Sequence, residues 1–273
     1  MTHLEDENYR QIFRRDMTKK HLLDFKVVEN NQKANGYSLL KLQPIGCEMP
    51  EILGGQFVNI QVNKSKNTFL RRPISVNYVD YEKNLLWLLI KDAGEGTHSL
   101  CNSLEGDILN ILLPLGRGFS LPPKKDSDIL LIGGGVGTAP MLYWGKILKD
   151  NGYKPRFLLG GRSATDLLEL DEFKEIGELY ISTEDASMGE MGFVTMHSVL
   201  NGKIDNIYCC GPSPMMKAVA KIATEKDCDC EVSLENKMAC GLGACLCCVE
   251  DTKEGNTCVC TSGPVFNIKE LKW

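Results

Sequence analysis

Hydrophobic residues recur in short runs through the first half of the chain. Between residues 22 and 121 these runs are separated by turn residues such as Asn35-Gly36 and Gly54-Gly55. Many β-rich runs at this spacing predict a small antiparallel barrel. The expected strands are LLDFKVVEN, YSLLKLQP, FVNIQVN, RPISVNYVD and LLWLLIKD, followed by a strand pair with glycine corners in LEGDILNILLPLGRGF.

The pattern changes at Lys124, where apolar strands begin to alternate with helical stretches. A strand is expected over residues 128–132, a glycine-rich turn over 133–137 and a helix over 138–149. Further strands are expected in RFLLGGRS, LYISTED and IDNIYCC, and further helices in DLLELDEFKEIG, GFVTMHSVLNG and PSPMMKAVAKIATEK. Alternating units predict a parallel sheet with helices on both faces and ligands at the carboxyl ends of its strands.

The chain therefore reads as a multidomain protein that combines a β domain with an α/β domain. Its expected parts are an N-terminal extension over residues 1–20, an antiparallel β-barrel over 21–123, a nucleotide-binding α/β domain over 124–227 and a small cysteine-rich subdomain over 228–273. A length of 273 residues is enough for two or three such domains, each with its own core.

Charge and composition exclude several classes of protein. A formal net charge of −5 argues against general nucleic-acid binding. No apolar run reaches the roughly eighteen residues of a membrane helix, and the N-terminus lacks the apolar region of a secretory signal. The 12 cysteines therefore favour a cytoplasmic protein whose thiols bind a metal rather than form disulfides.

Four cysteines in the last part of the chain carry the strongest chemical signal. They are spaced C-x4-C-x2-C, with a fourth after a loop: Cys240, Cys245, Cys248 and Cys260. This is the plant-type spacing of [2Fe–2S] ligands. Gly241 and Gly243 allow the backbone to turn tightly and to bring N–H groups near the cluster sulfurs.

Two other interpretations compete with the cluster. A tetrahedral zinc site also uses four thiolates, but it usually needs two C-x2-C pairs, and only Cys245 and Cys248 form one. Buried inert thiols are the second alternative. Spacing alone also leaves the fourth ligand open, because Cys258 would share a strand face with Cys260.

The expected barrel contains two candidate phosphate-binding motifs. The first is Arg72-Pro73-Ile74-Ser75, in which the Arg72 guanidinium can neutralise a diphosphate through bidentate contacts. The second is the Gly94-Glu95-Gly96-Thr97 turn, in which Gly96 and Thr97 open a helical stretch. An ordinary surface arginine and a plain helix N-cap at Thr97 are the alternatives.

The expected α/β domain opens with a glycine-rich turn between its first strand and helix. The turn comprises Gly133, Gly134, Gly135, Val136, Gly137 and Thr138. It favours a dinucleotide site over a simple strand–helix turn, although Thr138 stands where the G-x-G-x-x-G pattern has its third glycine. Cys210, Gly211 and Pro212 end a later strand at the same sheet edge. Arg162 and Ser163 could meet a ribose phosphate, so the choice between NADH and NADPH stays open.

Taken in order, MACGLGAC-x-x-C, the later C-x-x-GPVF, RPIS, GEGT, GGGVGTAPM and CGPSPMM resemble one known family. This is the electron-transfer subunit of NAD-dependent (class B) dihydroorotate dehydrogenases, within the ferredoxin–NADP reductase superfamily. The resemblance runs from about residue 22 to residue 266. It implies that residues 21–123 bind FAD, that 124–227 bind NAD(H) and that 228–273 hold the [2Fe–2S] cluster.

The resemblance also implies which residues hold each cofactor. FAD would contact the RPIS string, Gly96 and Thr97, and a segment before the glycine turn formed by Ile90, Lys91 and Asp92. The family often has Tyr-Arg at the first two of these positions, where this chain has Ile-Lys. The Cys-x-x-Gly-Pro ending favours Cys260 over Cys258 as the fourth cluster ligand. The nicotinamide would lie between residues 133–140 and 210–212, and the resemblance implies no catalytic acid or base.

Cofactor chemistry gives the expected order of transfer. A nicotinamide delivers a hydride, a [2Fe–2S] cluster accepts single electrons, and FAD connects the two. The implied partner is an FMN-containing catalytic subunit of pyrimidine biosynthesis, in a heterotetramer of two subunits of each kind. The alternative is a related FAD/[2Fe–2S] subunit of an NADH-dependent ferredoxin–NADP transhydrogenase or a sulfide dehydrogenase. A non-catalytic iron–sulfur sensor is a third possibility, which predicts no reduction of flavin by NADH.

Overall fold

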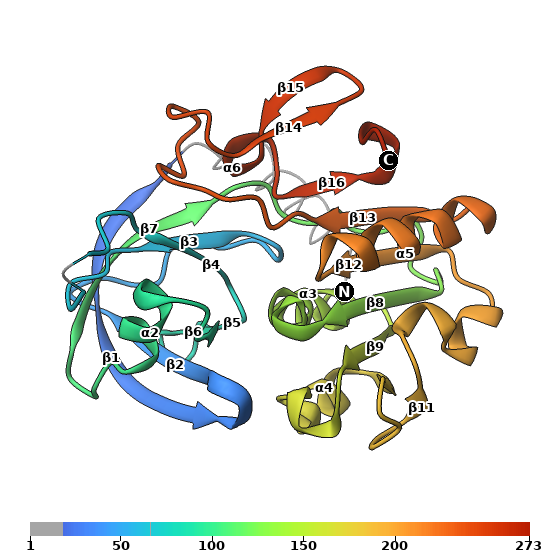
Figure 1. Cartoon of the computed structure of the whole chain (residues 1–273), viewed down its shortest axis with the longest axis horizontal. Helices are drawn as coiled ribbons and strands as arrows, with labels where there is room; N and C mark the ends of the chain where they lie inside the picture. The colour runs from blue at the N-terminus through green and yellow to red at the C-terminus, as the bar shows by residue number, and fades with distance from the viewer. Residues whose placement is uncertain (1–18, 66) are drawn as a thin grey trace.

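The computed structural model describes residues 19–65 and 67–273. It contains an antiparallel sheet and a mainly parallel sheet, each of seven strands, and a small two-stranded sheet. Figure 1 shows the antiparallel sheet on the left, the parallel sheet on the right and the C-terminal segment, in red, running over both. Residues 1–18, most of the expected N-terminal extension, lie outside the described residues.

The antiparallel sheet closes on itself through a very short connection. Its order is β4-β3-β7-β1-β2-β6-β5. The strands are β1 (His21–Lys33), β2 (Tyr37–Pro44), β3 (Phe57–Ile60), β4 (Arg72–Ser75), β5 (Tyr78–Asp80), β6 (Leu85–Lys91) and β7 (Ile108–Leu115). The edge strands β4 and β5 are separated in the chain only by Val76 and Asn77, so the sheet must curl until its two edges meet. This confirms the predicted antiparallel barrel.

The interior of the barrel follows from alternation along its strands. In β7, every second residue from Leu109 to Leu115 is buried. In β6, Leu86, Leu88 and Ile90 face the barrel core, whereas Leu89 packs outside the barrel against Tyr37 and Ala139. The short helix α2 (Glu95–Cys101) buries Leu100 and Cys101 in the same core.

The second sheet has the order β11-β10-β9-β8-β12-β13-β16. Its strands are β8 (Ile129–Gly134), β9 (Pro155–Gly161), β10 (Glu178–Thr183), β11 (Glu190–Met191), β12 (Asn206–Cys210), β13 (Asp229–Ser233) and β16 (Val265–Asn267). All neighbours are parallel except β13 and β16. Strand order reverses between β8 and β12, and this switch point is where ligands bind in doubly wound folds.

Three helices connect these strands: α3 (Ala139–Asp150), α4 (Leu170–Ile176) and α5 (Ser213–Glu225). The expected helix over 166–177 begins only at Leu170, because Glu169 adopts a left-handed conformation (φ 58°). The short helix region expected over 192–202 is divided into two 3₁₀ helices, η4 (Val194–Met196) and η5 (Ser198–Asn201). They are separate because His197 between them is extended and accepts the Val199 N–H.

The C-terminal segment links both sheets. After β13 the chain forms an irregular loop, residues 239–248, called here the cysteine loop. It continues through the hairpin β14 (Val249–Thr252) and β15 (Gly255–Cys258), and through the short helix α6 (Val259–Ser262), and then returns to the parallel sheet as β16. The predicted domain boundaries at 123/124 and 227/228 stay predictions. Strands β13 and β16, which both follow residue 227, belong to the mainly parallel sheet.

The remaining short turns are η1 (Ala34–Gly36), η2 (Gly135–Thr138), η3 (Ala164–Asp166) and η6 (Ile268–Glu270). No helix among residues 19–65 and 67–273 is long and apolar enough to cross a membrane. All 12 cysteines are free thiols.

A buried polar contact ties the barrel to the parallel sheet. Asn77 Nδ2, at the junction of β4 and β5, donates to Glu169 Oε2 (3.0 Å) and to the Ala139 carbonyl (3.2 Å). Asn77 Oδ1 and Glu169 Oε1 are buried and have no hydrogen-bond partner within the described chain. Burial raises the pKa of Glu169 from its ordinary 4.5 to about 7, although the Asn77 hydrogen bond acts in the opposite direction.

This carboxyl group should make stability depend on pH. Because its folded pKa is raised, protonated Glu169 contributes stability that is present at low pH and lost as pH rises through about 7. We expect Glu169→Gln and the wild type to have similar free energies of unfolding near pH 5. At pH 8 the free energy of unfolding of the variant should exceed that of the wild type by about 2 kcal/mol. Denaturant unfolding between these pH values measures the difference. The control Glu175→Gln, at an exposed position of α4, should show no such trend.

Candidate functional site

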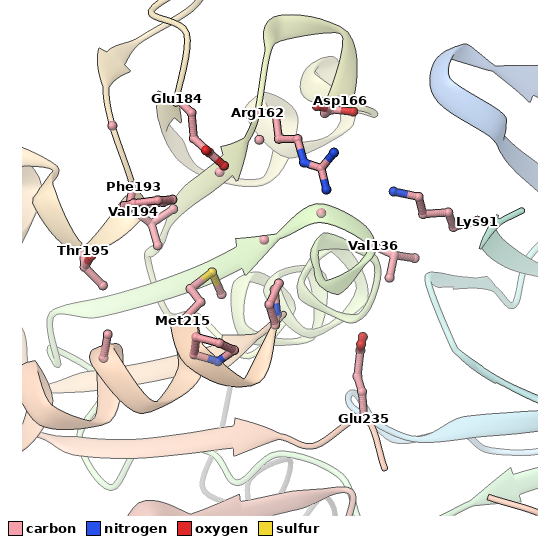
Figure 2. Close-up of a pocket in the computed structure, with 18 of the residues that line it drawn as sticks. Lys91, Val136, Arg162, Asp166, Glu184, Phe193, Val194, Thr195, Met215 and Glu235 are labelled. Carbon is pink, nitrogen blue, oxygen red and sulfur yellow. The ribbon is translucent and has the colours of Figure 1, made fainter. Parts of the chain in front are cut away.

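A cavity of about 510 Å³ opens at the switch point of the parallel sheet, between its carboxyl edge and the barrel. Figure 2 shows side chains from both sheets facing it. Its lining residues are Tyr37, Lys91, Gly134, Gly135, Val136, Gly160, Gly161, Arg162, Asp166, Glu184, Gly192, Phe193, Val194, Thr195, Pro212, Pro214, Met215, Ala218 and Glu235. The size suits an extended organic ligand.

The floor of the cavity is built by the close approach of two main-chain segments. A Cβ atom on Gly137 would lie 2.5 Å from the Cys210 carbonyl carbon and 2.6 Å from Gly211 Cα. A Cβ atom on Gly134 would meet Met215 Sδ at 2.5 Å. The glycine-rich turn and the Cys210-Gly211-Pro212 segment therefore meet, as the sequence predicted for strands that end at one sheet edge.

The barrel supplies the opposite wall. Lys91 Nζ lies 5.0 Å from the centre of the Tyr37 ring, and both residues line the cavity. Asp92 Oδ2 is 2.7 Å from His98 Nδ1. Ile90 is only 1% exposed and its side chain packs in the barrel core, so a ligand could meet this residue only through its main chain.

Arg72 and Gly96 are in direct contact. A Cβ atom on Gly96 would lie 2.4 Å from Arg72 Nε, so the guanidinium packs on the face left open by glycine. Arg72 Nη1 donates to the Leu70 carbonyl (2.8 Å), and Thr97 Oγ1 accepts the Ala93 N–H (2.9 Å). The two motifs of the barrel thus form one continuous surface that carries the Arg72 guanidinium, with all four residues of the RPIS string half-buried.

Charged residues line the far end of the cavity. Arg162 follows β9, Glu184 follows β10, and Asp166 lies in the turn after Arg162. In Figure 2 these three side chains lie above the glycine-rich turn, and Phe193 lies on the opposite side from Lys91. Two carboxylates beside one guanidinium suit hydroxyl groups of a ribose better than a further phosphate.

Glu235 lines the cavity at the start of the cysteine-rich segment. Burial raises its pKa. Burial also raises the pKa of the Cys210 thiol far above its ordinary value, and Glu235 adds to this shift. The Cys210 side chain is fully buried, so this residue shapes the site through its main chain.

The cysteine loop and the following helix α6 bring the four predicted ligands together. Gly241 (φ 72°) and Gly243 (φ 79°) turn the loop inward. The thiols of Cys240 and Cys245 interact with each other, as do those of Cys248 and Cys260. Backbone N–H groups point at the sulfurs: Leu242 N to Cys240 Sγ (3.3 Å), Gly243 N to Cys260 Sγ (3.2 Å) and Cys260 N to Cys248 Sγ (3.4 Å).

This arrangement fits a [2Fe–2S] cluster. Burial alone would raise the pKa of Cys240, but the N–H groups of Leu242 and Cys245 and the Cys245 thiol lower it to about 6. A binuclear cluster needs thiolates in two pairs, one pair per iron, and N–H donors toward sulfur.

The barrel supports the cysteine loop through Asn59. Asn59 Nδ2 lies 3.5 Å from the Ala239 carbonyl oxygen and 3.4 Å from that of Cys240. Asn59 in β3 is paired with Pro73 in β4. The thiol set and the RPIS string are therefore held by neighbouring positions of the same strand pair.

Comparisons with known proteins agree with this geometry. Residues 235–272 match the model of the iron–sulfur cluster binding domain of dihydroorotate dehydrogenase B, and residues 131–221 match the oxidoreductase NAD-binding domain. Three relatives are named dihydroorotate dehydrogenase B (NAD(+)), electron transfer subunit. The Fusobacterium nucleatum protein is 39% identical over 83% of this chain and 88% of its own. The Caldanaerobacter subterraneus protein is 41% identical over 80% of this chain and 86% of its own. The Clostridium perfringens protein is 38% identical over 91% of this chain and 97% of its own.

The chain belongs to this family of electron transfer subunits. It is therefore an oxidoreductase subunit with an NAD-binding domain and an iron–sulfur binding domain, which confirms those predictions.

Solved structures confirm the fold class. A chain of the NADH-dependent reduced ferredoxin-NADP oxidoreductase, studied for flavin-based electron bifurcation, superposes with a TM-score of 0.80 and 29% identity over 91% of this chain and 90% of its own. Phthalate dioxygenase reductase has the same fold, with a TM-score of 0.62 and 18% identity over 85% and 87%.

The cavity contains only part of the predicted set. Lys91, Gly134, Gly135, Val136 and Pro212 line it, whereas the other residues of the glycine-rich turn lie beneath its surface or support it. Four further lining residues lie at or directly after the carboxyl ends of parallel strands: Gly160, Gly161, Arg162 and Glu184. Ligands of doubly wound sheets bind at these strand ends, so the sequence predicts residues at such positions to line the site. Tyr37, Phe193, Met215 and Glu235 carried no sequence signal of this kind.

Substitution at Gly137 should test the close approach that forms the cavity floor. We expect Gly137→Ala to force the turn away from Cys210, to destabilise the protein by about 1–3 kcal/mol and to weaken binding of pyridine nucleotide. Thermal unfolding and NADH titration measure the two effects. The control is Gly202→Ala, where the new Cβ would meet only an ordinary contact of 3.4 Å and φ is −73°. Equal behaviour of the two variants would contradict this account of the floor.

Proposed function

We propose that this chain passes electrons between NAD(H), FAD and a [2Fe–2S] cluster, to and from an FMN-containing dihydroorotate dehydrogenase catalytic subunit of pyrimidine biosynthesis. The observation that carries this proposal is the convergence of three binding features on one strand pair. The Arg72–Gly96 surface, the cavity at the switch point and the cysteine loop are all anchored on β3, β4 and the residues directly after β4. Family membership supports a dihydroorotate dehydrogenase catalytic subunit as the partner.

When bound, FAD accepts a hydride from the nicotinamide and releases electrons singly to the cluster. The residues of this chain hold and orient the groups. Arg72 would neutralise the FAD diphosphate, with Gly96 leaving room for its guanidinium and the N–H groups at the start of α2 facing the anion. Pro73, Ile74, Ser75 and the Ile90-Lys91-Asp92 segment would complete the FAD site.

The cavity would hold the pyridine nucleotide. Residues Gly133 to Thr138 would bring main-chain N–H groups to its diphosphate, and Cys210, Gly211 and Pro212 would border the nicotinamide. Asp166 and Glu184 would accept hydrogen bonds from the adenosine ribose and would repel a 2′-phosphate, which favours NADH over NADPH. Tyr37 and Lys91 would lie between the pyridine nucleotide in the cavity and the FAD site on the barrel.

Electrons would leave through the exposed side of the cysteine loop. Cys240, Cys245, Cys248 and Cys260 would hold the cluster. The Cys245 thiol is exposed, and Leu242 and Leu246 beside it are 47% and 65% exposed. Exposed leucines around a redox centre suit a protein partner. We propose a heterotetramer of two subunits of each kind, in the cytoplasm, where free thiols are stable.

A second candidate follows from the structural comparison. The TM-score of 0.80 to the NADH-dependent ferredoxin-NADP oxidoreductase chain favours a related FAD/[2Fe–2S] subunit of an electron-bifurcating complex. The cofactor relay would be the same and the partner would differ. Purification under anaerobic conditions with the bound partner distinguishes them, because the first candidate predicts dihydroorotate-dependent reduction of NAD.

FAD binding should depend on the contact between Arg72 and Gly96. We expect Gly96→Ala to displace the guanidinium and to weaken FAD binding at least about tenfold, because a hydrogen bond to a charged group contributes about 1.5–3 kcal/mol. Fluorescence titration of flavin-stripped protein measures this loss. The control is Ser99→Ala in the same helix, and unchanged affinity in Gly96→Ala would contradict the assignment of Arg72.

Loss of one cluster ligand should interrupt the relay at a defined point. We expect Cys240→Ala to lose the cluster absorbance while NADH still bleaches the flavin under anaerobic conditions, and to abolish electron delivery to the partner subunit. The control is Cys47→Ala, an exposed cysteine of the barrel. Wild-type protein with bound zinc and no cluster absorbance would overturn the proposed function.

A further inference from the structure

A fifth thiol lies beside the four proposed cluster ligands. Cys258 ends β15, two residues before Cys260 in α6. Both thiols flank the same residue of the cysteine loop: the Gly243 N–H donates to Cys260 Sγ at 3.2 Å, and the Gly243 carbonyl accepts from Cys258 Sγ at 3.8 Å. A sulfur on either residue thus occupies the space next to Gly243.

Cys258 and Cys260 also share the same thiol neighbour. Cys258 pairs with Val249, the residue directly after Cys248, and the Cys260 N–H donates to Cys248 Sγ at 3.4 Å. The residue between them, Val259, donates its N–H to the Cys248 carbonyl at 3.0 Å. This hydrogen bond holds residues 258–260 against Cys248. Because Val259 lies between the two cysteines, it brings both of them near Cys248. Cys247, next to Cys248 in the chain, is exposed.

We propose, on the basis of the proposed function, that Cys258 is an alternative ligand of the iron that Cys248 holds and that it can replace Cys260. In the exchange, the Fe–Sγ bond of Cys260 breaks and a Fe–Sγ bond of Cys258 forms. The proton that leaves the Cys258 thiol is taken up by the released Cys260 thiolate. The irons keep their oxidation states, so the exchange needs no oxidant or reductant.

Hydrogen bonding favours Cys260 over Cys258 as the resident ligand. Cys260 is only 1% exposed and its sulfur accepts the Gly243 N–H, which stabilises a thiolate. Cys258 is half-buried and its thiol donates to a carbonyl, as expected of a protonated group. A cluster held by Cys258 would therefore have fewer N–H donors to sulfur and more contact with solvent, and both features alter its electronic properties.

The test compares cluster content after anaerobic reconstitution with iron and sulfide. The variants are Cys258→Ala, Cys260→Ala, the double variant C258A/C260A and the matched control Cys247→Ala. Iron and sulfide per chain, visible absorbance and the EPR spectrum of the dithionite-reduced protein are measured. We expect Cys258→Ala and Cys247→Ala to match the wild type, Cys260→Ala to retain about half or more of the cluster with an altered EPR spectrum, and the double variant to lose it. A Cys260→Ala variant as empty as the double variant would overturn the proposal.

A second pair of variants covers a folding defect, because Cys260 belongs to the buried core. Flavin absorbance and thermal unfolding report whether Cys260→Ala is folded. If it is not, Cys260→Ser is compared with C258A/C260S. Different EPR spectra support Cys258 as the ligand, and identical spectra show that the introduced serine holds the iron and overturn the proposal. A wild type without a cluster would refute the proposed function itself, whereas a wild type with a cluster and a Cys260→Ala variant without one would refute only the alternative ligand.

Discussion

The two-residue connection between β4 and β5 is the constraint on which the rest of the structure depends. Val76 and Asn77 join strands at opposite edges of the antiparallel sheet, so the sheet can form only as a closed, strongly curved barrel. The same connection carries the buried Asn77 side chain, which reaches the Ala139 carbonyl at the start of α3 and the Glu169 carboxyl group. The carboxyl edge of the parallel sheet is therefore held at a defined position beside the RPIS string. Asn59, paired with Pro73, holds the cysteine loop on the other side.

Under the proposed function, this arrangement would let one chain bring three cofactors together, and the prediction that no catalytic acid or base is needed would follow from position alone. Hydride transfer requires contact between the nicotinamide and flavin rings, and single-electron transfer requires a short path from flavin to cluster. Both requirements are positional. We propose that the residues that meet them are glycines that permit close main-chain approach, a guanidinium on a rigid strand and N–H groups directed at sulfur. The buried polar contact at Asn77 would keep the two sheets in register while substrates exchange.

Much of this account could be predicted from the sequence, because local chemistry determines it. The cysteine spacing, the strand–turn–helix at Gly133 and the alternation in the barrel strands each depend on neighbouring residues. Tyr37 and Glu235 could not be predicted, since they reach the cavity only after both sheets have packed together. The break between the two 3₁₀ helices within residues 192–202 has a local cause, the His197 ring that accepts the Val199 N–H, which periodicity does not reveal.

The most direct test of the relay is anaerobic stopped-flow reduction of the wild-type protein by NADH and by NADH deuterated at the transferred position. The account predicts that flavin bleaching comes first and is slowed by deuterium. Cluster reduction should follow without an isotope effect of its own. In protein stripped of FAD, NADH should not reduce the cluster. Reduction of the cluster by NADH at an unchanged rate in flavin-free protein would contradict the central claim that electrons pass from nicotinamide through FAD to the cluster.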